Sequence, residues 1–312
     1  MHSTSHFNNT QLGNIPAPAQ GEETGDPVLL RAFQGHRDRV TACVFNPNMK
    51  QMVTCSNDSM VMTWGLRPNT RPQKFQGHKG PVYDVAINQS GTQIASASQD
   101  RTIRLWNNNA EGFAEVLKGH SAPVKSVRFS CDGNLLLSAS DDKTVKIWSV
   151  QEKKFSMSLK GHTNWVRKAD FSYDSKLIAS ASDDKTVKLW DTQSGGTLVH
   201  TFTDHTGMVS DTKFHPDGTC IAACSSDKKI KIWDARSYRL LQHYDAHSDL
   251  INSISFHPSG QYLLSTSNDG SMKIWDLRRG HILYTLYGHE SQVTSGAFSP
   301  AGNFFVTGGK DS

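Results

Sequence analysis

Residues 138–148 read SASDDKTVKIW, and residues 180–190 read SASDDKTVKLW. The two stretches are identical at ten of eleven positions and begin 42 residues apart. Serine, aspartate, lysine and tryptophan build binding sites, but they also build turns and strand ends. The stretch is therefore either a site that occurs twice or part of a repeated framework, and the spacing of its residues along the whole chain distinguishes the two.

A repeat of 42 or 43 residues runs along the chain of 312 residues. Its first mark is a histidine, at His36, His78, His120, His162, His205, His247 and His289. An aspartate follows each histidine by 22 residues, at Asp58, Asp100, Asp142, Asp184, Asp227, Asp269 and Asp311. Six residues after each of the first six aspartates comes a tryptophan, at Trp64, Trp106, Trp148, Trp190, Trp233 and Trp275. Self-similarity at a fixed period of this length indicates an array of identical structural units.

Each unit is composed of short strands. In the third unit the runs VKSVRF (124–129), NLLLSAS (134–140) and TVKIW (144–148) are rich in β-branched and apolar residues and are bounded by turn residues. Four such strands per period of about 42 residues are typical of a β-propeller blade. The sequence therefore predicts an all-β fold, a seven-bladed β-propeller over residues 27–312. The Gly-His and Trp-Asp marks resemble the WD-repeat family over about residues 28–312.

The recurrent histidine, aspartate and serine could also suggest a hydrolase triad. Nucleophilic catalysis needs one exposed serine with a base and an oxyanion hole, however, and not seven copies of the set. A turn aspartate can instead accept the imidazole N–H, while a strand hydroxyl joins the second ring nitrogen to the indole N–H. The WD-repeat resemblance implies this tetrad, with hydroxyls from Thr54, Ser96, Ser138, Ser180, Ser265 and Thr307. Ala223 occupies that position in the fifth repeat, so we expect the network of His205 to be incomplete.

Composition limits the remaining classes of protein. The chain has 36% hydrophobic and 20% charged residues, and no apolar run reaches the length of a membrane span. Five cysteines without a CxxC pair predict reduced, buried thiols rather than disulfides or a zinc site. No phosphate-binding loop, HExxH or GxSxG motif is present. The sequence thus predicts no cofactor, no metal, no enzyme activity, no nucleic-acid partner and no membrane partner.

The two ends depart from the repeat. Residues 1–26 carry three acidic and no basic residues and are predicted to form a disordered arm, which leaves a net charge of +7 on the rest of the chain. The segment PVLLRAF (27–33) is placed to complete the last blade. The seventh unit stops at Ser312, before its tryptophan and third strand, so we expect a blade that lacks this strand and a natural protein that continues further.

Positions that vary between repeats are candidates for a partner-binding rim. The resemblance places the third and fifth residues after each histidine, and the residue before each tetrad aspartate, on one rim of the propeller. These positions include Arg39, Tyr83, Lys125, Trp165, Arg167, Met208 and Leu250. Aromatic, methionine and arginine side chains are enriched at protein interfaces. The alternative is that Trp165 packs beneath a neighbouring loop or the N-terminal arm.

Four segments carry a closer resemblance: GHTNWVRKADF (161–171), FHPDGTCIAAC (214–224), residues 239–277 and residues 283–309. They are similar to the proteome-of-centriole WD-repeat proteins, which are components of centrioles and basal bodies. The resemblance implies a non-catalytic scaffold in the cytoplasm and cytoskeleton. It would contact centriolar and axonemal tubulin and inner-scaffold proteins, support centriole, basal-body and cilium formation, and self-associate through a coiled coil beyond residue 312. An adaptor in a ubiquitin ligase or signalling complex is the second interpretation, and an enzyme or nucleic-acid binder the third.

Overall fold

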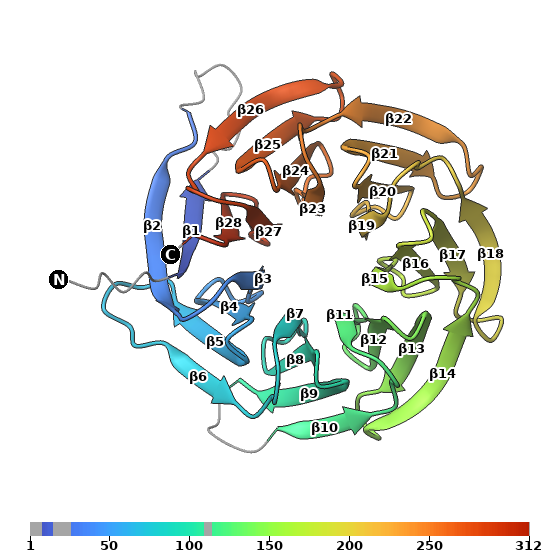
Figure 1. Cartoon of the computed structure of the whole chain (residues 1–312), viewed down its shortest axis with the longest axis horizontal. Helices are drawn as coiled ribbons and strands as arrows, with labels where there is room; N and C mark the ends of the chain where they lie inside the picture. Colours follow the sequence, from blue (N-terminus) through green and yellow to red (C-terminus); the bar gives the residue numbers. More distant parts are fainter. Residues whose placement is uncertain (1–7, 15–25, 109–113, 312) are drawn as a thin grey trace.

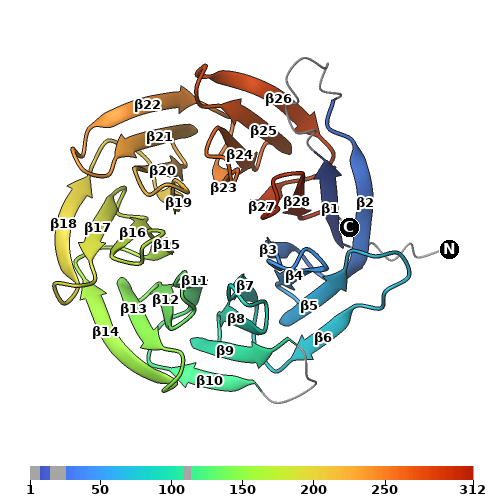
Figure 2. The same cartoon turned by 180° about the vertical axis from the view of Figure 1, so that it is seen from behind.

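The computed structural model describes residues 8–14, 26–108 and 114–311, and for 8–14 the backbone alone. Seven four-stranded antiparallel sheets are arranged in a ring, as Figure 1 and the reverse view in Figure 2 show. The innermost strands of the seven sheets line a central channel. The described residues contain strands and turns, and none of their segments is a helix able to cross a membrane. The predicted all-β propeller is thereby confirmed.

Each of the first six blades takes its four strands from one continuous stretch of chain, ordered from the channel outward. The first three blades are β3 (Val40–Phe45), β4 (Gln51–Ser56), β5 (Met60–Gly65) and β6 (Gln73–Gln76); β7 (Val82–Ile87), β8 (Gln93–Ser98), β9 (Thr102–Asn107) and β10 (Glu115–Lys118); β11 (Val124–Phe129), β12 (Leu135–Ser140), β13 (Thr144–Ser149) and β14 (Lys154–Lys160). The next three are β15 (Val166–Phe171), β16 (Leu177–Ser182), β17 (Val187–Asp191) and β18 (Thr197–Phe202); β19 (Val209–Phe214), β20 (Cys220–Ser225), β21 (Lys229–Asp234) and β22 (Leu240–Asp245); β23 (Ile251–Phe256), β24 (Tyr262–Ser267), β25 (Ser271–Asp276) and β26 (His281–Tyr287).

The seventh blade combines both ends of the chain and differs from the prediction. Its order is β2 (Leu29–His36), β1 (Asn8–Asn14), β28 (Phe304–Gly309) and β27 (Val293–Phe298). β1 thus lies in the third position, which the sequence predicted to be empty, and pairs Thr10–Asn14 with Phe304–Gly308. An unpaired strand edge accepts a further strand through backbone hydrogen bonds alone. The stretch NNTQLGN therefore forms a strand without the apolar alternation that marks the others, and the predicted disorder of residues 8–14 is wrong. Residues 1–7 and 15–25 of the predicted arm lie outside the described residues.

The hydrophobic core lies between neighbouring blades. One cluster, for example, joins Leu189 and Phe202 of the fourth blade to Ile221 and Trp233 of the fifth. Single blades are too thin to bury both of their faces, so each sheet depends on the next. The ring is also linked at its inner edge, where the Thr294 hydroxyl of the seventh blade donates to the Val40 carbonyl of the first.

The opening stretch forms β12, a tight turn and β13. In that turn Asp142 Oδ1 accepts the backbone N–H of Thr144 at 3.1 Å, and Lys143 has a φ of 69°. Lys185 of the second copy has a φ of 72°. Both copies thus fold into the same turn at the same end of adjacent blades.

The five cysteines are free, but only three are buried, namely Cys43, Cys55 and Cys224. Cys131 is exposed in a turn and Cys220 is half-buried. The prediction of uniformly buried thiols was therefore wrong for these two, because Cys131 lies in the surface turn between β11 and β12, and Cys220 is the first residue of β20, directly after the corresponding turn.

Candidate functional site: the channel mouth and its framework

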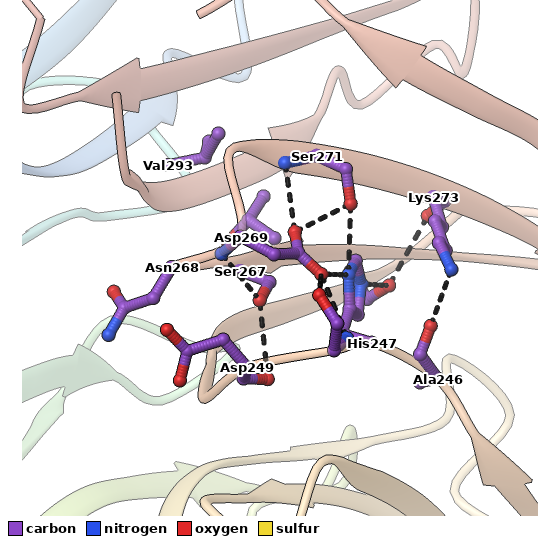
Figure 3. Close-up of polar contacts among 12 residues, drawn as sticks. Ala246, His247, Asp249, Ser267, Asn268, Asp269, Ser271, Lys273 and Val293 are labelled. Atoms are coloured by element: carbon purple, nitrogen blue, oxygen red, sulfur yellow. Dashed lines mark hydrogen bonds and ion pairs between the residues drawn. The ribbon is translucent and has the colours of Figure 1, made fainter. Parts of the chain in front are cut away.

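The histidine and aspartate of every repeat are in contact. The Nδ1–carboxylate distances lie between 2.7 and 3.0 Å in all seven repeats. In six repeats the histidine Nε2 lies 2.7–2.9 Å from the predicted hydroxyl. In five of these the indole N–H donates to the same oxygen at 2.7–2.9 Å. Figure 3 shows the sixth-blade set around His247 and Asp269, where the Ser271 hydroxyl also approaches Nδ1.

The hydrogen bonds of the tetrad determine its protonation. The hydroxyl oxygen accepts from the indole, so its own proton points to histidine Nε2, and Nδ1–H donates to the carboxylate. Burial lowers the pKa of His78 and of His247, which favours this neutral imidazole. Burial alone would raise the pKa of Asp100, but hydrogen bonds from Thr102 and His78 lower it to about 2. The aspartate is therefore a fixed anion that closes the turn.

The fifth repeat has a different network. Ala223 supplies no hydroxyl, and His205 Nε2 is buried without a partner among the described residues, as the sequence predicted. Trp233 Nε1 donates instead to Asp204 Oδ2 at 2.8 Å. Asp204 occupies the position that is the glycine of Gly-His in most repeats. Its carboxylate thus replaces, for Trp233 alone, the hydroxyl that Ala223 lacks.

These tetrads are buried framework. Their histidine side chains are at most 1% exposed, so no substrate reaches them. Within residues 8–14, 26–108 and 114–311, no group of histidine, cysteine and acidic side chains could hold a metal ion. The variable residues at the channel mouth are therefore better candidates for a functional site.

The second residue of each innermost strand faces the mouth of the channel. Where this residue is small and polar it links neighbouring blades: Thr41 donates to the Val82 carbonyl at 2.5 Å, and Asn252 donates to the Val293 carbonyl at 2.6 Å. Ser210 and Thr294 make the equivalent contacts. The second to fourth blades depart from this pattern and carry Tyr83, Lys125 and Arg167. Three consecutive blades thus place long side chains at the mouth in place of the small linking residue.

These three side chains line a cavity of about 310 Å³ together with Arg39, which we call the mouth cavity. Lys125 Nζ lies 3.6 Å from the centroid of the Tyr83 ring and 3.5 Å from Asp141. Burial lowers the pKa of Lys125 and raises that of Asp141. Arg39 has no ion-pair partner among the described residues, and burial lowers its pKa. The mouth cavity therefore combines an aromatic face with a desolvated, unpaired cation.

Arg167 is held in place by its neighbours. Its Nε and Nη2 donate to the two carboxylate oxygens of Asp183 at 2.7 and 2.6 Å, and this pairing raises the pKa of Arg167. The guanidinium also lies 5.3 Å from the ring of Trp165, which is 45% exposed. A fixed guanidinium beside an exposed indole is a common arrangement at protein interfaces.

The residues that were predicted to form one partner-binding rim thus fall into two groups in the structure. Arg39, Tyr83, Lys125 and Arg167 line the mouth cavity, whereas Trp165, Met208 and Leu250 do not. Trp165 and Met208 are exposed and Leu250 is half-buried. Asp141 and Asp183 occupy the position before the tetrad aspartate, which was also expected on this rim, and they are the first aspartates of the two SASDDKT copies. The second aspartate of each pair belongs to the tetrad, and the first holds a cation at the mouth.

The fold and the repeated tetrads define a class of protein. A family profile described as "WD domain, G-beta repeat" matches residues 27–65, 69–107, 113–149, 153–191, 196–234, 238–276 and 280–312. The chain therefore belongs to the WD-repeat family of β-propeller proteins.

Curated relatives resemble the chain over short stretches. POC1 centriolar protein homolog A of Xenopus tropicalis is 52% identical over 46 residues, which are 15% of this chain and 10% of that protein. POC1 centriolar protein homolog B of Mus musculus is 46% identical over 46 residues, again 15% and 10%. Homolog A of Bos taurus is 51% identical over 46 residues, or 15% and 11%. The matched stretch thus spans about a tenth of each relative.

Proposed function

We propose that this propeller is a non-catalytic scaffold of centrioles and basal bodies. The observation that carries the proposal is the similarity to several proteins named POC1 centriolar protein homolog, combined with a WD-repeat fold along the chain. The buried tetrads support a structural role, because their polar groups are directed at one another and not toward a substrate.

The partner surface that we propose is the mouth cavity with the adjacent Trp165 and Met208. An exposed indole, an exposed thioether and a guanidinium fixed by Asp183 provide apolar area and directed hydrogen bonds with little loss of side-chain entropy. We expect this surface to contact centriolar or axonemal tubulin or a protein of the inner scaffold. Self-association would come from a coiled coil outside residues 1–312.

Localisation of the tagged full-length protein tests the proposal. We expect a focus that coincides with centrioles in dividing cells and with basal bodies in ciliated cells. Depletion should reduce the number of cilia or the stability of centrioles. A diffuse cytosolic signal without such a focus would instead favour the interpretation as an adaptor of another complex.

A further inference from the structure

A second cavity, of about 430 Å³, lies at the outer part of the first blade. We call it the basic pocket and define it by Lys50, Gln51, Thr63, Arg67, Arg71 and Gln73. None of the described residues that line it is acidic. The charged groups of Lys50, Arg67 and Arg71 form no ion pair among the described residues, in contrast to the paired cations Lys125 and Arg167 at the channel mouth.

A fourth cation comes from the neighbouring blade. Arg31 of β2 donates from Nη1 to the carbonyl of Arg67 at 3.2 Å, which places its guanidinium against the loop between β5 and β6. Figures 1 and 2 both show this loop beside β2. The guanidinium of Arg31 thus lies beside the loop that carries Arg67 and Arg71, at the boundary of two blades, although Arg31 itself does not line the basic pocket.

The floor of the basic pocket contains an unusual hydroxyl. Thr63 is 2% exposed, and its Oγ1 has no hydrogen-bond partner among the described residues. The residue before the tryptophan is apolar in the other repeats: Leu105, Ile147, Leu189, Ile232 and Ile274. Burying an unpaired hydroxyl is unfavourable compared with an aliphatic side chain of similar size. Thr63 thus gives the lining of the basic pocket a buried hydroxyl that no described residue satisfies.

The loop that carries the two arginines is restrained before any ligand arrives. The Thr70 hydroxyl donates to the carbonyls of Gly65 and Arg67 at 3.0 and 2.9 Å. Pro68 and Pro72 fix the backbone on either side of Asn69, which has a φ of 60°. A preorganised loop loses little entropy on binding.

We propose that the basic pocket binds the side-chain carboxylates of an acidic segment of a partner polypeptide. Arginine forks pair with carboxylates through two parallel hydrogen bonds, and an excess of unpaired positive charge attracts a segment of several acidic residues. The Thr63 hydroxyl would donate to one of the carboxylates. This inference does not depend on the centriolar role, since it holds for a propeller in any complex.

The test uses fluorescence anisotropy of a labelled glutamate-rich decapeptide, with a glutamine-rich decapeptide as reference. The charge-reversal variant R67E/R71E should lose at least about tenfold in affinity. The control variant K118E/K160E has the same net charge but changes exposed lysines on β10 and β14, and it should lose less than about threefold. Equal losses in the two variants would show attraction by net charge alone and would overturn the proposal.

A second variant separates binding from folding. Thr63→Val removes the unpaired hydroxyl and retains the shape of the side chain, so its thermal midpoint should be equal to that of the parent or higher. Its affinity for the glutamate peptide should still fall by about threefold or more. Unchanged affinity in Thr63→Val would refute the role of the hydroxyl, and tighter binding of a phosphoserine peptide than of the glutamate peptide would refute the assignment to carboxylates.

Discussion

Trp233 donates its indole N–H to Asp204 Oδ2 at 2.8 Å, in the one repeat that has no hydroxyl for the tetrad. The indoles of the first four and the sixth repeats donate to a serine or threonine instead. Asp204 therefore accepts the hydrogen bond of the tryptophan, while His205 Nε2 is buried and has no partner in the part of the chain that the structure describes. The fifth blade shows that the indole and the imidazole of a tetrad can be satisfied separately.

Replacement of Asp204 should destabilise the protein in a way that depends on residue 223. Asp204→Ala leaves the buried indole N–H of Trp233 unpaired and should lower the free energy of unfolding by about 1–3 kcal/mol. Ala223→Ser supplies the missing hydroxyl to His205 Nε2 and should raise it by about 1 kcal/mol. Urea unfolding of both variants measures these changes.

The double variant is the control for this explanation. In the Ala223→Ser background the new hydroxyl can accept from Trp233, as Ser180 accepts from Trp190 at 2.8 Å. The loss caused by Asp204→Ala should then be smaller than in the parent protein, which is non-additivity between neighbouring residues. Equal losses in the two backgrounds would mean that Asp204 acts through another contact.

Acid should lower the free energy of unfolding in part through protonation of Asp84, which lies in the channel wall. Its carboxylate lies 3.2 Å from Arg128 Nη1 and 3.0 Å from Lys168 Nζ. Burial would raise its pKa, but these two cations lower it from 3.8 to about 2. A pKa that is lower in the folded state stabilises the protein fully above 3.8, and this stabilisation disappears as the pH falls through about 2.

Asp84→Asn measures this contribution. At neutral pH the variant should be less stable by on the order of 2 kcal/mol, because Arg128 and Lys168 lose their counter-charge. The difference between parent and variant should shrink as the pH is lowered from about 4 to about 2, since the parent then protonates Asp84. Urea unfolding at several pH values gives both curves. A difference that stays constant over this range would contradict a lowered pKa.

The repeated framework could be predicted from the sequence because its marks are local and periodic. Each histidine, hydroxyl, aspartate and tryptophan falls at a fixed spacing, and the hydrogen bonds lie where this spacing placed them. The turn SDDKT could likewise be assigned from residue type, because aspartate accepts backbone N–H groups two residues on.

Features that depend on distant parts of the chain were missed. β1 pairs with β28 across almost the whole length of the sequence, through backbone groups that residue type does not reveal. The replacement of the tetrad hydroxyl by Asp204 was missed for a related reason. Asp204 occupies the position that is glycine in most repeats. Because glycine has no side chain that could form a hydrogen bond, the repeat pattern does not mark this position as a partner of Trp233. The WD-repeat resemblance places Asp141 and Asp183 on the predicted partner-binding rim, but their ion pairs with Lys125 and Arg167 were not predicted, because they join side chains from different strands.

Thiol reactivity should distinguish the five cysteines in the native protein. Burial raises the pKa of Cys43 to about 12 and raises those of Cys55 and Cys224 further, so these thiols carry almost no thiolate at neutral pH. Cys131 is exposed and should react first with an aromatic disulfide reagent, followed by Cys220. Cys131→Ser should remove the fast phase of labelling. Rapid labelling of all five sites would contradict the buried positions of the other three.

Trp165→Ala should separate partner binding from stability. The indole is 45% exposed, so its loss should change the free energy of unfolding by less than about 1 kcal/mol. Phe155→Ala is a matched control, because this ring is 49% exposed but lies on the outer strand β14, away from the mouth. If the mouth binds the partner, the ratio of centriolar to cytosolic fluorescence should fall severalfold for Trp165→Ala and remain unchanged for Phe155→Ala. Equal ratios for the two variants, with both proteins folded, would show that Trp165 is not part of the binding surface. The outer strands would then be the region to test.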